Sequence, residues 1–216
     1  LQGGPGDDRL NGGTGQDTAS YRDAPGTVTV NLATSTATGA AGTDRLSLIE
    51  HIEGGAAADR LSGDGLANTL GGRFGDDRLL GLHGNDRLLG QRGDDRLEAG
   101  PGSDWLDGGP GDDRLIGGTG RDTQAGGVGA DRFTWTTLAD SPAGAGRDRL
   151  TDFTPATDRL DLAAIDARPA TPTTNDAFTF LATPGAAFTA PGQVRWYQSA
   201  GHTLVEASTD ADTAPE

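Results

Sequence analysis

A nine-residue unit repeats without interruption from residue 54 to residue 134, and this repeat constrains the fold more than any other feature of the chain. The common pattern is glycine, any, any, glycine, any, aspartate, any, leucine, any, as in GGPGDDRLI at residues 108–116. Two further copies occupy residues 3–20. A fixed short period of this kind indicates a solenoid, in which every coil stacks on its neighbours.

The two halves of the unit predict different backbone conformations. The first six residues carry glycines suited to a positive φ and end in an aspartate, so they predict a turn. The last three residues predict a very short strand, in which position eight points away from positions seven and nine. Position eight is leucine in the first seven copies and then Gln124 and Phe133, so we expect it to face inward.

Two units make one coil with a strand on each side, so residue i is expected to stack on residue i+18, about 4.8 Å away. The predicted fold is therefore all-β, a parallel β-roll. The sixth position of every copy is an acid or its amide: Asp59, Asn68, Asp77, Asp86, Asp95, Asp104, Asp113, Asp122 and Asp131. Stacked carboxylates about 5 Å apart repel by roughly 0.8 kcal/mol in water and by several-fold more inside a protein. A single row of leucines is a thin core, so we expect a cation between the coils.

Calcium suits the predicted turns best, because they offer carboxylate and carbonyl oxygens and calcium takes six to eight oxygen ligands in tolerant geometry. Zinc and copper favour nitrogen or sulfur, but the chain has no cysteine and its three histidines share no spacing. Stacked pairs run from Asp59 with Asp77 to Asp113 with Asp131. We predict five to seven ions in the main roll, with five as the central value, because Asn68 lacks charge and Ala57 replaces a turn glycine.

These units resemble the glycine- and aspartate-rich nonapeptides of the RTX family, the repeats-in-toxin proteins of bacterial type I secretion. The resemblance implies a parallel β-roll with calcium bound between successive turns. It implies side-chain ligands at position six of the main repeats, and at Asp8 and Asp17 in the first pair of repeats. It also implies backbone ligands in the glycine-rich turns; in two of the copies these glycines are Gly108, Gly109, Gly111, Gly117, Gly118 and Gly120.

Residues 129–166 resemble the carboxy-terminal region of serralysin-type proteins, in which a small β-sandwich caps the roll. Apolar alternation predicts strands at residues 178–181, 194–197 and 204–207, with the last two joined as a hairpin. In that family an acid-rich loop and a final apolar strand follow, so TDADTAPE at residues 209–216 predicts a truncated cap. Further candidate calcium ligands in this region are Asp140, Asp148, Asp152, Asp158, Asp210 and Asp212.

The predicted organisation has four parts. Residues 1–20 hold the first pair of repeats, residues 21–53 form a strand-rich intervening segment, residues 54–134 form the nine-repeat roll, and residues 135–216 form the truncated cap. Two alternatives stay open for residues 21–53: they continue the roll as longer, calcium-free coils, or they form a separate small insertion domain.

Composition indicates that the metal-free chain is largely disordered. The net charge is −15, only 33% of residues are hydrophobic and 5% are aromatic, so burial alone supplies little stability. Extracellular calcium modules bind with dissociation constants of about 10⁻⁴ to 10⁻³ M, well above cytosolic calcium. We therefore predict a secreted module that folds on meeting extracellular calcium, supports type I secretion, and stabilises an upstream domain of the same protein.

The chain begins in mid-repeat and contains no methionine, which predicts a piece of a longer secreted protein. No apolar run approaches the roughly 18 residues of a membrane span, and we expect no nucleic-acid partner. No HExxH or GxSxG motif occurs, and without lysine no Walker motif is possible. We predict no enzymatic activity in this segment. The alternatives are the carboxy-terminal region of an extracellular hydrolase, such as a metalloprotease or lipase, or of a polysaccharide-modifying enzyme, and an adhesive or ice-binding surface.

All 17 basic residues are arginine, and five of them recur at intervals of 18: Arg60, Arg78, Arg96, Arg114 and Arg132. This spacing predicts an outward row on one face. The favoured interpretation is that these arginines neutralise the neighbouring acids Asp76, Asp94 and Asp112; the alternative is binding to an anionic polysaccharide or lipopolysaccharide. Similarly, Trp105 beside Arg87 is predicted to be shielded by flanking side chains, with stacking on a sugar ring as the alternative.

Overall fold

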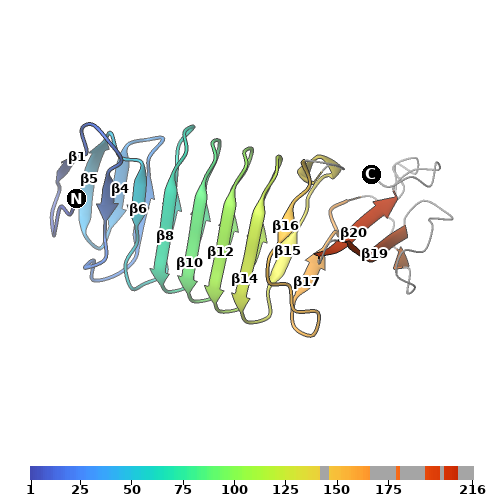
Figure 1. Ribbon diagram of the computed structural model, residues 1–216. Helices are drawn as coiled ribbons and strands as arrows, with labels where there is room; N and C mark the ends of the chain where they lie inside the picture. Colours follow the sequence, from blue (N-terminus) through green and yellow to red (C-terminus); the bar gives the residue numbers. More distant parts are fainter. Residues whose placement is uncertain (142–145, 166–178, 181–192, 200–201, 209–216) are drawn as a thin grey trace.

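The chain forms an elongated rod of β-strands in a computed structural model (Figure 1). The structure describes residues 1–141 and 146–165, together with the strands at residues 179–180, 193–199 and 202–208. The named strands are accompanied by a short 3₁₀ turn, η1 (Leu138–Asp140). The predicted all-β fold is confirmed.

Two long sheets form the sides of the rod. The first has ten strands, in the order β1 (Arg9–Asn11), β5 (Gly42–Ser47), β4 (Thr36–Gly39), β3 (Val28–Asn31), β7 (Arg60–Ser62), β9 (Arg78–Leu80), β11 (Arg96–Glu98), β13 (Arg114–Ile116), β15 (Arg132–Thr134) and β17 (Arg159–Asp161). The second has seven, in the order β16 (Arg149–Leu150), β14 (Thr123–Val128), β12 (Trp105–Pro110), β10 (Arg87–Arg92), β8 (Thr69–Phe74), β6 (His51–Glu53) and β2 (Thr18–Ser20).

The register between strands of the repeats is parallel with an offset of 18 residues. Leu79 pairs with Leu61 and Leu97 in the first sheet, and Leu88 pairs with Leu70 and Leu106 in the second. The seven leucines at position eight, together with Gln124 and Phe133, have no exposed surface. These residues fill the narrow space between the two sheets, so the β-roll predicted from the repeat is confirmed.

The lengths of the strands depart from the sequence prediction on one side of the roll. Strands of the main repeats in the first sheet are three residues long, as expected, but those in the second sheet are six residues long. In the second sheet the pairing resumes after position one, so that Gln91 pairs with Arg73 and Arg92 with Phe74. The first half of every second repeat is therefore partly extended, because its backbone continues to pair with the neighbouring coil.

The strands of residues 21–53 lie in the same two sheets as the repeats. In the first sheet β3, β4 and β5 form an antiparallel meander, whose outer strands pair in parallel with β7 and β1. In the second sheet β6 lies between β2 and β8. The core there is built from Val28, Val30, Leu46, Ile49 and Ile52, all of them buried.

Beyond residue 134, two short strands continue the roll. β16 pairs in parallel with β14, and β17 pairs in parallel with β15. Phe153 packs against Phe133 with 6.0 Å between the ring centroids and, together with Leu150 and Leu160, extends the core beyond the last repeat.

A third sheet contains β18 (Thr179–Phe180), β19 (Gln193–Ser199) and β20 (His202–Ser208). β19 and β20 pair in antiparallel register, with Ser199 opposite His202, so the predicted hairpin is confirmed. The β-sandwich cap of serralysin type stays a prediction. Asp210, Asp212 and the rest of residues 209–216 lie outside the described residues.

Candidate metal-binding turns

The carboxylates at position six line the inside of the turns and form a hydrogen-bonded ladder. Asp59, Asp77, Asp86, Asp95, Asp104, Asp113, Asp122 and Asp131 are all at most 3% exposed. Oδ1 of each carboxylate from Asp77 to Asp131 accepts the backbone N–H of the position-six residue 18 positions earlier, at 2.7–3.0 Å. The sequence repeat thus places these acids in two stacked columns, one along each edge of the roll.

The second oxygen of most of these carboxylates is buried and has no hydrogen-bond donor in the protein. Among the described residues, this holds for Oδ2 of Asp8, Asp17, Asp77, Asp86, Asp95, Asp104, Asp113, Asp122 and Asp131. A buried carboxylate oxygen without a partner is costly, because it has lost its hydration and gained nothing in return. The same unpaired oxygen recurs in successive repeats, so it is a regular feature of the turn.

The glycine at position one forms one wall of each turn. A Cβ on Gly90 would lie 2.3 Å from Oδ2 of Asp95 and 2.6 Å from the carbonyl oxygen of Gly108. A Cβ on Gly108 would likewise lie 2.3 Å from Oδ2 of Asp113 and 2.6 Å from the Gly126 carbonyl oxygen. The unpartnered Oδ2 and a carbonyl oxygen of the next coil therefore converge on the same side of the glycine.

The glycines at positions two and four allow successive turns to stack closely. Gly109, Gly111, Gly118 and Gly120 have φ values of +105°, +148°, +96° and +128°. A Cβ on any of them would lie 1.6–2.3 Å from a carbonyl oxygen of the coil before, whereas a Cβ on Gly117 would meet Oδ2 of Asp122 at 2.3 Å. The turns therefore present backbone carbonyl oxygens to one another, as well as carboxylates.

Burial raises the pKa of these carboxyl groups. The pKa values of Asp77, Asp95, Asp104, Asp113 and Asp122 rise to about 7, first because the groups are desolvated and further because stacked carboxylates repel one another. The backbone N–H bond to Oδ1 opposes this rise without cancelling it. The raised pKa values mean that the charged form of these groups is disfavoured. Near neutral pH a nearby positive charge would therefore stabilise the ionised carboxylates.

The first two position-six residues of the main block differ from the rest. Oδ1 of Asp59 accepts the N–H of Val28 at 2.8 Å, and its Oδ2 accepts the N–H of Gly55 at 2.6 Å. Asn68 accepts the N–H of Asp64 through Oδ1 and donates from Nδ2 to the Glu50 carbonyl. Protein groups thus satisfy both side chains, in contrast to the acids that follow.

The intervening segment supplies its own partners for the first pair of repeats. Oδ1 of Asp44 accepts the N–H of Asp8, in the manner of a position-six acid, whereas its Oδ2 accepts the hydroxyl of Tyr21 at 3.0 Å. Glu50 accepts the N–H of Asp17 at 2.9 Å. A phenol hydroxyl therefore occupies the place next to Asp44 where the repeats offer no donor.

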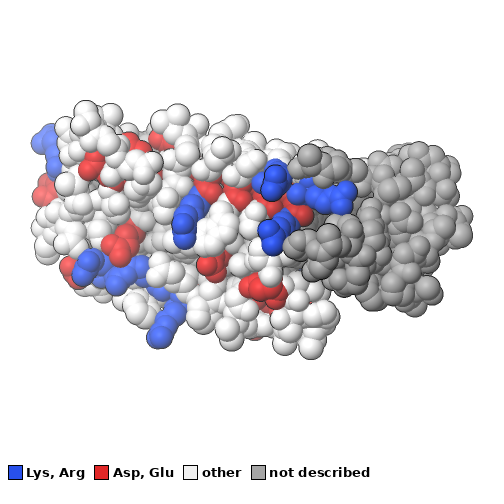
Figure 2. Space-filling view, in the orientation of Figure 1, with Lys and Arg blue, Asp and Glu red and all other residues white. Residues whose placement is uncertain are grey.

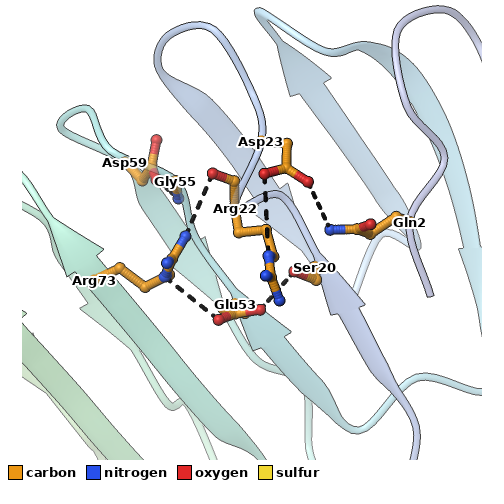
Figure 3. A network of polar contacts seen from close by, with 8 residues as sticks. All are labelled: Gln2, Ser20, Arg22, Asp23, Glu53, Gly55, Asp59 and Arg73. Carbon is orange, nitrogen blue, oxygen red and sulfur yellow. Dashed lines mark hydrogen bonds and ion pairs between the residues drawn. The ribbon is translucent and has the colours of Figure 1, made fainter.

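The contacts in Figure 3 bind the first coils to the main block. Glu53 accepts a hydrogen bond from the hydroxyl of Ser20 and forms a 3.4 Å ion pair with Arg73. Arg73 also donates to the carbonyl oxygen of Arg22 at 3.3 Å. Gln2 donates to Asp23 at 3.2 Å. The same view includes Asp59, the first position-six acid of the main block, whose carboxylate accepts the N–H of Gly55.

A similar capping arrangement closes the carboxy-terminal end of the ladder. Oδ1 of Asp148 accepts the N–H of Asp122, and its Oδ2 accepts Nε1–H of Trp135 at 2.8 Å. Asp158 accepts the N–H of Asp131 through Oδ1 and the N–H of Thr154 through Oδ2. The sequence analysis named both acids as candidate metal ligands, but the structure gives all four oxygens protein donors.

The candidate ligands Asp152 and Asp140 also have hydrogen-bond donors within the protein. Asp152 accepts the N–H groups of Gly126 and Gly127. Asp140 accepts four hydrogen bonds from Thr136 and Thr137, and these bonds outweigh its burial and lower its pKa. These acids therefore join segment 135–165 to the roll or fix its local turns.

The arginines of the first sheet do not pair with the acids predicted for them. Arg78 and Arg96 both contact Glu98, and Arg132 contacts Asp161 at 3.4 Å. Asp76 and Asp94 instead accept backbone N–H groups 18 residues later in the chain, as Asp112 does from Ala130. The reason is geometric: position five lies in the turn, close to the next turn, and position seven lies on the strand.

The second sheet carries a more mixed surface. The guanidinium of Arg87 lies over the Trp105 ring, 4.1 Å from its centroid, so the predicted shielding of Trp105 is confirmed. Figure 2 shows one face of the rod, in the orientation of Figure 1, on which basic side chains lie in separate groups beside acidic ones.

The donors in the turns suit calcium. They are carboxylate and carbonyl oxygens, and calcium accepts both in irregular geometry. Among residues 1–141 and 146–165, no three His, Cys, Asp or Glu side chains gather as a metal-binding group. Side chains alone would therefore not complete a coordination sphere, and backbone carbonyls would have to supply the remaining ligands. No helix in the described part of the chain is long and apolar enough to cross a membrane.

Comparison with known proteins agrees with this geometry. The family model of the RTX calcium-binding nonapeptide repeat (4 copies) matches residues 1–19, 51–70, 62–97, 71–106, 89–124 and 98–133. No curated protein matches the chain. The matches include every coil whose position-six carboxylate has an unpartnered Oδ2, and residues 1–19 and 51–133 carry the calcium-binding nonapeptide repeats of the RTX family.

Proposed function

We propose that this chain is a calcium-dependent folding module, in which Ca²⁺ ions bound between successive turns hold the roll together. The ligands are the position-six carboxylates and the carbonyl oxygens of the glycine-rich turns. The observation that carries this proposal is the recurrence of a buried Oδ2 without a donor among the described residues. For Asp77, Asp86, Asp95 and Asp113 a carbonyl oxygen of the next coil lies beside the same position-one glycine.

The number of ions follows from the stacked pairs in which both carboxylates have an unpartnered Oδ2. In the main roll these pairs are 77/95, 86/104, 95/113, 104/122 and 113/131. We therefore propose five ions in this part of the roll. Asp59 and Asn68, whose polar atoms have protein partners, are weaker candidate ligands. Asp8 and Asp17 are further candidate ligands in the first coil, one at each edge of the roll.

Charge explains why folding would depend on calcium. The chain carries a net charge of −15, and the fold buries a large share of its acids in two columns with raised pKa values. Each Ca²⁺ brings two positive charges to these columns, so the folded state would gain stability as more ions bind. In the low calcium of a cytosol the chain would stay unfolded, in a state suited to passage through a type I secretion channel.

The proposed biological role follows from this dependence. The module would fold on meeting extracellular calcium, prevent return of the exported chain, and stabilise an upstream domain of the same protein. Millimolar extracellular calcium would be sufficient for dissociation constants of about 10⁻⁴ to 10⁻³ M.

Two adjacent aspartates provide a matched test. Asp95 belongs to two of the proposed ion sites, whereas Asp94 is exposed and uses Oδ1 to accept the N–H of Asp112. Asp95→Asn and Asp94→Asn remove the same charge from the same turn. We expect isothermal titration calorimetry to show a loss of up to two ions for Asp95→Asn and none for Asp94→Asn.

Circular dichroism tests the coupling to folding. The wild-type chain should be poor in β-structure in excess chelator and should gain it on titration with calcium. An equally β-rich chain in chelator would contradict the coupling, and equal calcium binding by both variants would contradict the assigned ligands.

A further inference from the structure

Six consecutive strands of the first sheet begin with an arginine, and these arginines are directly paired in register. This arginine row consists of Arg60, Arg78, Arg96, Arg114, Arg132 and Arg159. The leucine or phenylalanine that follows each of them points into the core, so the arginines face outward. With about 4.8 Å between strands, the row spans about 24 Å.

The acids on this face neutralise only part of the row. Glu98 is shared by Arg78 and Arg96, and Asp161 contacts Arg132. The other three arginines form no ion pair among the described residues: Arg60, Arg114 and Arg159. Among the side chains of these six strands, six positive and two negative charges leave an excess of four. Like charges directly opposite one another destabilise a sheet, so the row carries a cost that an anionic partner would offset.

The geometry of the roll does not itself require arginine at this position. The equivalent residues of the second sheet are Thr69, Arg87, Trp105, Thr123 and Arg149. Conversely, Arg159 lies outside the nonapeptide repeats, 27 residues after Arg132, and still continues the row. The positive charge is thus concentrated on one face of an otherwise acidic chain.

We propose that the arginine row binds a linear acidic polysaccharide that carries one carboxylate on each sugar, a polyuronate. Guanidinium groups bind carboxylates through paired hydrogen bonds. A chain of sugar rings repeats its carboxylates at intervals comparable to the spacing of the strands. Leu80 and Ile116, half-buried on the same outward side of their strands, offer apolar contacts for the ring faces.

A single-stranded nucleic acid fits this face less well. Such ligands are bound by aromatic side chains that stack on successive bases. The third residues of these six strands, two positions after each arginine, include no aromatic side chain: they are Ser62, Leu80, Glu98, Ile116, Thr134 and Asp161.

Two triple variants with equal loss of charge test the proposal on the full chain in saturating calcium. The row variant is Arg60→Ser, Arg114→Ser and Arg159→Ser. The control variant replaces three exposed arginines outside the row: Arg92→Ser, Arg121→Ser and Arg149→Ser. The probe is an oligogalacturonate long enough to span the row, and its dissociation constant is measured by calorimetry. Circular dichroism first establishes that both variants fold with calcium.

We expect the row variant to bind the oligogalacturonate at least about tenfold more weakly, because charge-assisted contacts are lost. The control variant should remain within about twofold of the wild type. Since neither variant changes an acid, calcium bridging between protein and sugar is the same in both. Equal losses in the two variants would overturn the proposal, as would no binding by the wild type. Equally tight binding of neutral dextran or of a single-stranded DNA oligonucleotide would overturn the choice of ligand.

Discussion

The phenol hydroxyl of Tyr21 donates a 3.0 Å hydrogen bond to Oδ2 of Asp44, the oxygen that has no donor in the nonapeptide repeats. At the other end of the ladder, Trp135 donates to the equivalent oxygen of Asp148 at 2.8 Å. Both side chains satisfy a carboxylate with a neutral donor, whereas in the proposed function the repeats rely on a cation. We therefore expect Asp44 and Asp148 to depend less on calcium than the position-six acids of the main block.

Removal of the Tyr21 hydroxyl should show how much its hydrogen bond to Asp44 stabilises the chain. Tyr21→Phe leaves Oδ2 of Asp44 buried without a donor, so the free energy of unfolding should fall by about 1–3 kcal/mol. Urea denaturation in saturating calcium measures the change. In the double variant with Asp44→Asn the cost of Tyr21→Phe should become smaller, since no carboxylate remains to be satisfied; an unchanged cost would show that the hydroxyl acts elsewhere.

The raised pKa values predict that acid can partly replace calcium. The pKa values of Asp77, Asp95, Asp104, Asp113 and Asp122 rise to about 7 in the folded chain, mainly through burial, against about 3.9 when unfolded. Between these values the folded state binds more protons than the unfolded state. The contribution of these carboxyl groups to the stability of the calcium-free roll is therefore fully present below about pH 4, and it is lost as the pH rises through about 7.

Circular dichroism in excess chelator measures this effect as a gain of β-structure on acidification. In saturating calcium the trend should reverse, because protons compete with calcium for the same carboxylates. The double variant Asp95→Asn/Asp113→Asn should show a weaker gain in chelator. Loss of β-structure on acidification in chelator would contradict the prediction.

Gln124 is a buried polar residue that a leucine should improve. It occupies the inward position between Leu106 and Leu150 in the second sheet and has no exposed surface. Neither Oε1 nor Nε2 has a hydrogen-bond partner among the residues that the structure describes. Gln124→Leu should raise the free energy of unfolding by about 1–3 kcal/mol, because the buried amide is removed. Thermal denaturation in calcium provides the measurement, and a lower melting temperature would count against this account.

Position two of the repeat allows substitutions with opposite effects in neighbouring coils. Gln91 has φ of +76°, which is unfavourable for a residue with a side chain, whereas Gly109 has φ of +105° and its Cβ would lie 2.1 Å from the Gln91 carbonyl oxygen. Gln91→Gly should stabilise the roll by up to about 1 kcal/mol. Gly109→Ala should destabilise it by about 1–3 kcal/mol. Urea denaturation of both variants in saturating calcium measures the two changes in the free energy of unfolding. Changes of the same sign would contradict this prediction.

The main roll could be predicted from the sequence because its glycines and its leucines recur with the same nine-residue period. Glycine at positions one and four and leucine at position eight recur together, so the turns, the inward face and the 18-residue register follow from one pattern. The sixth-position acids were placed correctly for the same reason. The repeat could not reveal that strands of the second sheet are twice as long, since the added pairing depends on backbone contacts between coils.

The flanking coils were harder to predict because their units stand apart from the unbroken runs of repeats. The tripeptide Asp-Arg-Leu recurs at residues 44–46, 148–150 and 158–160. Gly39 and Gly42 precede the first of these, Gly144 and Gly146 precede the second, and no glycine-rich turn precedes the third. In each case the aspartate accepts the N–H of an acid in the neighbouring coil, as in the repeats. This tripeptide was the available signal. Its partners Tyr21 and Trp135 carry no periodic mark, so they become apparent only in three dimensions.

The 18-residue register couples each coil to the coils immediately before and after it and to no others within the repeats. A molecule connected in this way is quasi-one-dimensional, and its stability is a sum over neighbouring interfaces. A strongly destabilising substitution in a central coil would therefore leave two shorter folded blocks, one on each side of that coil. Amide hydrogen exchange along the rod would then decline in protection step by step toward the break.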